Sequence, residues 1–190
     1  MDNLLINYIK LLRPIPDDDG KIIAGHFTHK AFREGEFLIQ PNKIAREMFF
    51  VTNGVIRIGS INDKGIELTH YFYNEKRFVS IIQSFNDEIP TAAFIQAVCN
   101  AEVLSIAKSK LLDLYKELPY MKDLIEQQNQ LHMIEKVNTR NSYLGEEAET
   151  RYKLFVTQYP DIAPRVPLKD IASYLGITQQ SLSRIRKNMR

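Results

Sequence analysis

Cysteine is nearly absent from the sequence, since Cys99 is the only one among 190 residues. A single thiol excludes an intrachain disulfide framework, a zinc site of several cysteines and a cysteine-held iron–sulfur cluster. Long apolar runs are also missing, because no stretch approaches the ~20 residues that a membrane helix needs. The first residues, Met1 to Leu4, lack the basic and then apolar order of a signal peptide. These absences predict a cytoplasmic protein that does not enter a membrane.

Net charge is only +2, but it is unevenly distributed along the chain. Residues 165–190 contain six basic side chains and one acid, Asp170, so this segment is +5 and the rest of the chain is −3. A basic terminal segment on a mildly acidic body is typical of a small nucleic-acid-binding module attached to a larger domain. With 44% hydrophobic and 25% charged residues, the composition is that of a folded globular protein.

The N-terminal third changes from a helical pattern to a strand pattern. Apolar residues between Leu4 and Leu12 recur at helical spacing, and Pro14 and Pro16 end that helix. From about Phe32 onward, short runs rich in β-branched and aromatic residues alternate with turn signals, which is typical of a sandwich or barrel.

Two glycine-containing turns stand out in this strand region. Asn53-Gly54 and the loop Asn62 to Gly65 each predict a hairpin, because glycine tolerates positive φ. Both separate short runs of strand-forming residues, so we expect each pair of flanking strands to be hydrogen-bonded neighbours.

A helical pattern returns at Lys108 and includes a long helix over 119–144. Pro119 opens it, and neither Gly nor Pro follows until Gly145. A helix of about 25 residues spans roughly 38 Å, which is long for a small domain and favours pairing with a partner helix. The alternative is that the helix packs along its own barrel. The residues predicted to face a second copy of the chain are Met121, Leu124, Gln128 and Leu131.

The last residues carry the most informative motif, a helix-turn-helix. Apolar residues at i, i+3, i+4 and i+7 from Leu168 occupy one face of a short helix, with the small Ala172 where two helices would cross. Gly176 suits the left-handed position that ends this helix, and Thr178 suits the N-cap of a second one. This spacing predicts a helix-turn-helix.

The second helix of this motif presents side chains suited to DNA. Amides and guanidinium groups pair bidentately with adenine and guanine edges, and the N-terminal part of a recognition helix reaches the bases. We expect base contacts from Gln179, Gln180 and Arg184. We expect phosphate contacts, which give affinity without sequence information, from Lys169, Thr178, Ser181 and Lys187.

The order of these parts resembles the Crp/Fnr family of bacterial transcription regulators over nearly the whole chain. The stretches Gly35 to Ile39, Met48 to Arg57 and Asp63 to Glu67 look like the start of a cyclic-nucleotide-binding β-roll. The resemblance implies an α+β protein with an N-terminal double-stranded β-helix as sensor (1–118), a dimerisation helix (119–144) and an all-α helix-turn-helix domain (145–190).

The same resemblance implies the partners. They are double-stranded DNA with a two-fold symmetric operator and a second copy of the chain in a homodimer, with RNA polymerase as a further candidate. The β-wing that usually follows the recognition helix in the family is expected to be missing, because the sequence stops three residues after Lys187.

Two positions depart from the nucleotide-binding members of the family. Ile81 and Pro90 stand where those members carry a Glu for the ribose and an Arg for the cyclic phosphate. A buried phosphate would then have no charged partner, so we do not expect cyclic AMP as the effector, and we expect no cofactor or metal. A pocket for another effector is predicted from Ser80, Ile81, Thr91, Ala92, Lys136 and Val137.

Other functions fit the sequence less well. A metal-dependent enzyme on a β-roll would need clustered histidines, but only His70 lies in the strand region, and neither a Ser-His-Asp set nor a phosphate-binding glycine loop is visible. No catalytic residue is therefore assigned. Haem ligation by His70 or Cys99 stays open. The alternative to a regulator is a non-enzymatic adaptor that binds a small molecule or a protein through a degenerate β-roll.

Overall fold

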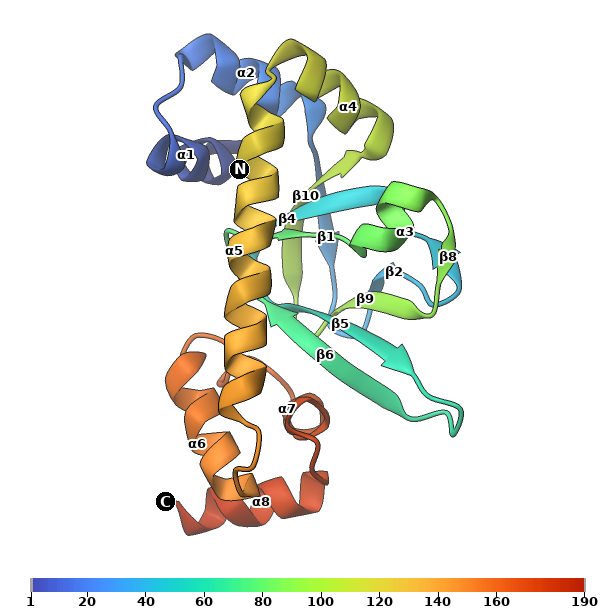
Figure 1. Cartoon of the computed structure of the whole chain (residues 1–190), viewed down its shortest axis with the longest axis vertical. Coiled ribbons are helices and arrows are strands. Elements are labelled where there is room, and N and C mark those ends of the chain that lie inside the picture. The colour runs from blue at the N-terminus through green and yellow to red at the C-terminus, as the bar shows by residue number, and fades with distance from the viewer. Residues whose placement is uncertain (1, 190) are drawn as a thin grey trace.

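The computed structural model of the protein describes residues 2–189, and it places a β-roll between two groups of helices (Figure 1). The helices are α1 (Asp2–Leu12), α2 (Asp17–His26), α3 (Ile82–Asp87), α4 (Lys108–Glu117), α5 (Tyr120–Ser142), α6 (Ala148–Gln158), α7 (Leu168–Leu175) and α8 (Gln179–Asn188). The strands are β1 (Thr28–Phe32), β2 (Phe37–Ile39), β3 (Lys43–Ile44), β4 (Glu47–Asn53), β5 (Ile56–Ile61), β6 (Glu67–Tyr73), β7 (Phe78–Val79), β8 (Pro90–Thr91), β9 (Ala93–Ala97) and β10 (Ala101–Ala107). The α+β class and the β-roll are confirmed.

Two four-stranded antiparallel sheets form the roll. One has the order β1-β10-β4-β7 and the other β2-β9-β5-β6, with the short pair β3-β8 beside them. Side chains on β4 and β10 such as Phe50, Val51 and Val103 are fully buried, and β4 is buried on both of its faces. Their β-branched and aromatic character suits this pleated, buried position.

One of the two predicted hairpins is present and the other is wrong. The loop from Asn62 to Gly65 joins β5 to β6, and the Asn62 side chain accepts hydrogen bonds from the backbone N–H groups of Lys64 and Ile66, both at 3.0 Å. At Asn53-Gly54 the chain instead passes from one sheet to the other, because β4 pairs with β10 and β7 while β5 pairs with β6 and β9.

Gly54 is needed at this crossing for a different reason from a hairpin turn. It has a φ of +94°, and a Cβ atom there would lie 2.5 Å from the carbonyl oxygen of Asn100. The glycine therefore allows two backbone segments to approach closely.

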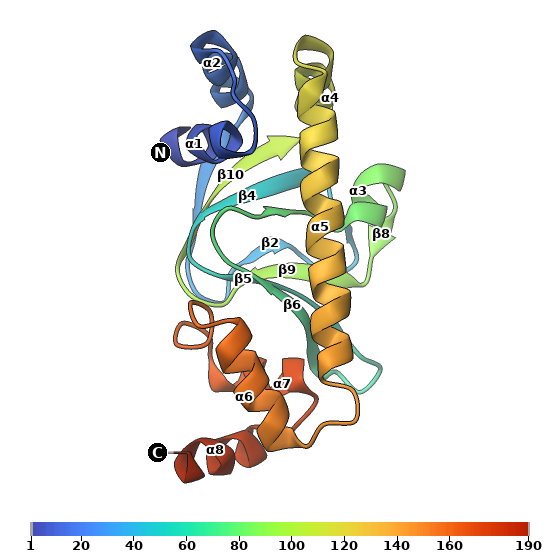
Figure 2. The same cartoon turned by 60° about the vertical axis from the view of Figure 1, so that its left-hand side comes forward.

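Helix α5 runs along the roll and links the two helical groups (Figures 1 and 2). It begins after Pro119 and ends at Ser142, within the predicted range 119–144. Its first half packs on the main core, together with α1, α2 and α4, through Met121, Leu124 and Ile125.

A second core lies among the three C-terminal helices, and the roll contributes to it. Phe155 and Leu182 are its fully buried members from α6 and α8, and Val55 and Val98 enter it from the roll. Helix α7 is thus packed against β6 (Figure 2).

Among residues 2–189, none of the helices combines the length and the apolar character needed to cross a membrane. The same residues contain no cluster of three His, Cys, Asp or Glu side chains that could hold a metal ion. Up to Met189, no strand follows α8.

Candidate nucleic-acid interface and effector pocket

Helices α7 and α8 form the predicted helix-turn-helix. Gly176 ends α7 in the left-handed region at φ 67°, and the N–H of Ile177 donates a 3.0 Å hydrogen bond back to the carbonyl of Ala172. Thr178 caps α8, because its hydroxyl accepts a 3.1 Å hydrogen bond from the N–H of Ser181. Both helix ends are satisfied by local chemistry.

The packing of the motif matches its sequence pattern with one exception. Ile171, Ala172, Leu175 and Leu182 are buried between α6, α7 and α8. Met189 would continue the apolar spacing of Leu182 and Ile185 on the second helix, but it is 43% exposed. It lies one residue beyond the end of α8, where no further helix covers it.

The side chains predicted to contact DNA all lie on exposed positions. Gln179, Gln180 and Arg184 are exposed on α8, at one end of the molecule (Figure 1). The predicted phosphate contacts Lys169, Thr178, Ser181 and Lys187 are exposed as well. Among the ion pairs of residues 2–189, none involves a basic residue of α8, so those cations are available to a polyanion.

The stripe predicted for pairing of α5 with a partner helix needs correction. Met121, Leu124 and Gln128 are buried against the chain's own roll, and the Gln128 side chain accepts a 2.7 Å hydrogen bond from the Tyr8 hydroxyl. This half of α5 follows the alternative in which the helix packs along its own barrel. Leu131 alone of the four is exposed.

Further along α5, an apolar surface faces away from the roll. Leu131, Ile134 and Val137 are 52, 58 and 49% exposed, and their spacing of three places them on one side of the helix. An exposed apolar stripe on a long helix is typical of helix pairing. This surface, rather than the buried stripe, is the part of α5 that a second copy could contact.

The residues predicted to form an effector pocket are not brought together as one set. Ser80 and Lys136 line a cavity of about 440 Å³ between the roll and α5, with Met48, Phe78 and Tyr115 among its other walls. Ala92 and Val137 are exposed. Ile81 precedes α3 and packs on the core, and the Thr91 hydroxyl accepts a hydrogen bond from the N–H of Ala93.

The segment between β7 and β8 lacks the charge needed to hold a phosphate. Residues 80–91 include two acids, Asp87 and Glu88, and no Lys or Arg. Ile81 and Pro90 at the family's nucleotide positions add no polar side chain. A phosphate bound at this segment would therefore have no lysine or arginine of residues 80–91 as a partner.

A buried arginine joins the roll to the helix-turn-helix, and this contact was not predicted from the sequence. Arg57 on β5 is 1% exposed, and its guanidinium donates hydrogen bonds to Gln96, Thr69, Glu67 and Asp170. The bond to Asp170, on α7, is 2.8 Å long. Burial raises the pKa of the Asp170 carboxyl, and the guanidinium of Arg57 opposes this shift.

Further contacts support the same junction. The Ser173 hydroxyl on α7 accepts a 2.9 Å hydrogen bond from the N–H of Thr69 and donates one to the carbonyl of Glu67. Arg165 pairs with Glu75 at 2.6 Å, between the segment after α6 and the turn after β6. Alternation of buried and exposed residues along β5 could not have predicted that Arg57 is buried, because its neighbour Ile56 is buried as well.

The two residues left open as haem ligands have other partners. The ring of His70 is 2.8 Å from the Ser60 hydroxyl, and the sulfur of Cys99 accepts a hydrogen bond from the N–H of Val55. The two side chains thus take part in local strand and loop contacts.

Known proteins were compared with this architecture. Residues 29–117 match the family model for the cyclic nucleotide-binding domain. No curated protein matches the chain at a significant level of sequence similarity.

Solved structures match over most of the chain. The c-di-GMP responsive global regulator CLP of Xanthomonas campestris is 14% identical, with 92% of this chain and 91% of that chain covered and a TM-score of 0.72. FixK2 from Bradyrhizobium japonicum is 15% identical, with 86% and 84% covered and a TM-score of 0.73. A Crp/Fnr-family structure from Eubacterium rectale is 15% identical, with 96% and 87% covered and a TM-score of 0.71.

At these identities the likeness is one of fold, and it extends through the roll, α5 and the C-terminal helices. The chain therefore has the fold of the Crp/Fnr transcriptional regulators, with a β-roll of the cyclic nucleotide-binding type over residues 29–117.

Proposed function

We propose that the protein regulates transcription by binding double-stranded DNA as a homodimer at a two-fold symmetric operator. The observation that carries this proposal is the exposed face of α8, where Gln179, Gln180 and Arg184 stand clear of the rest of the chain. Two amides and a guanidinium on one recognition helix can read adenine and guanine edges in the major groove. Such a regulator would act in the cytoplasm, and contact with RNA polymerase stays a prediction.

The dimer is proposed from the exposed surface of Leu131, Ile134 and Val137 on α5. A pair of α5 helices in contact through this surface would relate two helix-turn-helix motifs by a two-fold axis. Symmetric regulators bind half-sites about one helical turn apart, so the two copies of α8 would enter successive major grooves.

The effector of this regulator is proposed to be something other than cyclic AMP. Residues 80–91 offer no cation to a phosphate and carry two acids. Titration of the protein with cyclic AMP should therefore leave its DNA affinity and its thermal unfolding temperature unchanged.

The test of the proposed function is selection of genomic fragments by the purified protein at about 50 and about 200 mM salt. Enrichment of a palindromic motif would support a dimeric, sequence-specific regulator. Salt-sensitive binding without a motif would contradict sequence-specific regulation by the protein alone. Absence of binding at both salt concentrations would favour the adaptor function instead.

A further inference from the structure

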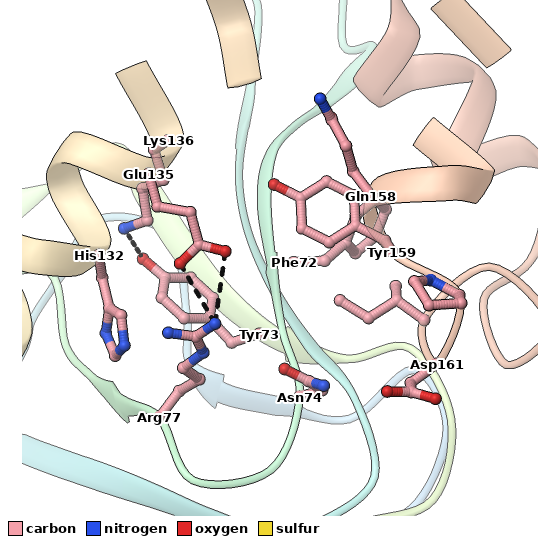
Figure 3. Close-up of a pocket in the computed structure, with 12 residues that line it drawn as sticks. Phe72, Tyr73, Asn74, Arg77, His132, Glu135, Lys136, Gln158, Tyr159 and Asp161 are labelled. Carbon is pink, nitrogen blue, oxygen red and sulfur yellow. Dashed lines mark hydrogen bonds and ion pairs between the residues drawn. The ribbon is translucent and has the colours of Figure 1, made fainter. Parts of the chain in front are cut away.

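A cavity of about 280 Å³ lies where three parts of the chain meet. Strand β6 supplies Tyr73, the turn after it supplies Arg77, α5 supplies His132 and Lys136, and the segment after α6 supplies Asp161 (Figure 3). The cavity is thus bounded by the roll, the long helix and the C-terminal helices. It differs from the set of residues predicted as the effector pocket, of which it contains only Lys136.

Lys136 brings a partly buried positive charge to this cavity. Its ammonium group donates a hydrogen bond to the Tyr73 hydroxyl and lies 4.6 and 4.5 Å from the ring centres of Tyr71 and Tyr73. No carboxylate of residues 2–189 is within ion-pair distance of it. Burial, with the nearby charge of Arg77, lowers the pKa of Lys136 to about 8, so the group remains mostly charged at neutral pH.

His132, one helical turn before Lys136, brings an unused hydrogen-bonding atom. Its side chain is 7% exposed, and its Nδ1 atom is buried without a partner. Burial, with the charges of Arg77 and Lys136, lowers the pKa of His132 to about 4, so the ring is neutral at pH 7. Buried polar atoms of native proteins are nearly always hydrogen-bonded, and each exception calls for an explanation.

The acids near the cavity form no ion pair with Lys136, although the charge of Glu135 partly opposes the lowering of the Lys136 pKa. Glu135 is engaged by Arg77 in an ion pair of 3.2 Å, shown by dashed lines in Figure 3. Asp161 is exposed and lies across the cavity from Lys136 (Figure 3). The cavity therefore contains an ammonium group that forms no ion pair among residues 2–189, and it is also lined by the His132 ring.

We propose that this cavity binds a small polar molecule that carries an oxyanion group, either a carboxylate or a phosphate. Its oxygen atoms would accept hydrogen bonds from Nζ of Lys136, and the His132 ring, which lines the same cavity, would lie next to it. An anion at this point supplies the ammonium group with a counter-charge, and charge-assisted hydrogen bonds in a partly dry site are the strong ones. The volume is at the lower end of ligand pockets, so the molecule is small.

A ligand here would contact both the roll and the segment that follows α6. It would therefore favour the arrangement in which the two parts are docked, as any molecule does that binds one conformation better than another. The proposal does not depend on DNA binding, and it goes beyond the function proposed above.

The experiment is a titration followed by NMR of the histidine side chains. The protein, labelled with ¹⁵N and ¹³C, is titrated with sodium phosphate in one series and sodium acetate in another, with sodium chloride at matched ionic strength as reference. The four histidines report separately, and a His132→Gln spectrum assigns the signal of that ring. We expect saturable shifts of the His132 signal with phosphate or acetate, and the two series distinguish the two anions.

Lys136→Met and Lys122→Met form the matched pair of variants, because both lysines lie on α5 and Lys122 is 58% exposed. Lys136→Met should weaken binding about tenfold or more, since it removes a charged hydrogen-bond donor, and Lys122→Met should leave it unchanged. Equal shifts of His26, His29 and His132 with all salts would overturn the proposal, as would saturable binding that survives Lys136→Met. The wild-type titration decides the matter even if that variant does not fold.

Discussion

The guanidinium of Arg57 on β5 donates a 2.8 Å hydrogen bond to the carboxylate of Asp170 on α7, across 113 residues of sequence. Both side chains are buried, so this ion pair is withdrawn from water. It ties the first helix of the helix-turn-helix to the roll, and the same guanidinium is held by Glu67 and Gln96. The orientation of α7 relative to the roll is therefore fixed by a charged contact that needs all its partners.

Replacement of Arg57 should lower the free energy of unfolding more than replacement of Asp170, its partner on α7. Arg57→Met leaves the buried carboxylate of Asp170 without a cation, which should cost about 3–5 kcal/mol in the free energy of unfolding. Asp170→Asn should cost about 1–3 kcal/mol, because Arg57 keeps Glu67 and the amide can still accept a hydrogen bond. Urea unfolding of the two variants measures both values.

Asp113→Asn is the control for this comparison. Asp113 pairs with Lys116 at 2.8 Å, but both side chains are largely exposed. Its loss should leave stability nearly unchanged, because an ion pair between exposed side chains contributes little. An Arg57→Met variant as stable as this control would refute the role assigned to the buried pair.

Loss of a base contact on α8 and loss of a phosphate contact on α7 should affect DNA binding differently. Arg184→Ala should cost about 1–3 kcal/mol on the selected operator and relax base preference at one position. Lys169→Ala should weaken specific and non-specific binding alike and reduce the salt slope by about one unit. Fluorescence anisotropy at several salt concentrations measures both effects. Unchanged operator affinity in Arg184→Ala would show that α8 does not read the bases.

The exposed surface of α5 predicts the oligomeric state. Ile134→Glu places a charge in the proposed helix pair, so it should shift the protein toward monomer in sedimentation and weaken operator binding. The monomer fold should persist, because Ile134 is 58% exposed. Lys122→Gln, on an exposed part of the same helix, should leave the dimer intact. A wild-type monomer at all concentrations would contradict the dimer itself.

Local chemistry explains why the helix-turn-helix could be predicted from the sequence. The left-handed glycine at 176, the cap at Thr178 and the apolar spacing from Leu168 each act within a few residues. The loop from Asn62 to Gly65 was predictable for the same reason, since its hydrogen bonds close within the loop. The many short strands predicted a sandwich or barrel, but the order of the strands in the two sheets is known only from the structure.

Three of the errors involve partners that are distant in sequence. Asn53-Gly54 carries a hairpin signal, but the close approach of Asn100 makes it a crossing between sheets. Met121 on α5 has the same apolar character whether it meets a partner helix or its own roll, and only the position of the roll decides. Asp170 seemed a lone acid in a basic segment, because its cation is 113 residues away.

His132 predicts a specific contribution to the pH dependence of stability. An unfolded histidine binds its proton near pH 6.5, whereas the pKa of folded His132 is lowered to about 4 by burial and by Arg77 and Lys136. Between these values the unfolded chain holds the proton and the folded chain does not, so stability falls as the pH is lowered from about 6.5 toward 4. The contribution of this group should be about 1–3 kcal/mol.

Urea unfolding between pH 7.5 and 4.5 measures this effect against two variants. His132→Gln should show a shallower fall in stability on acidification than the wild type, because its side chain does not titrate in this range. His29→Gln, at an exposed ring 3.1 Å from Glu102, is the control for replacement of a histidine by glutamine. Phosphate or acetate in the cavity next to Lys136 would raise the pKa of His132 and so reduce the difference between wild type and His132→Gln. Parallel curves for wild type and His132→Gln would mean that this ring titrates as it does in the unfolded chain, which its burial without a partner argues against.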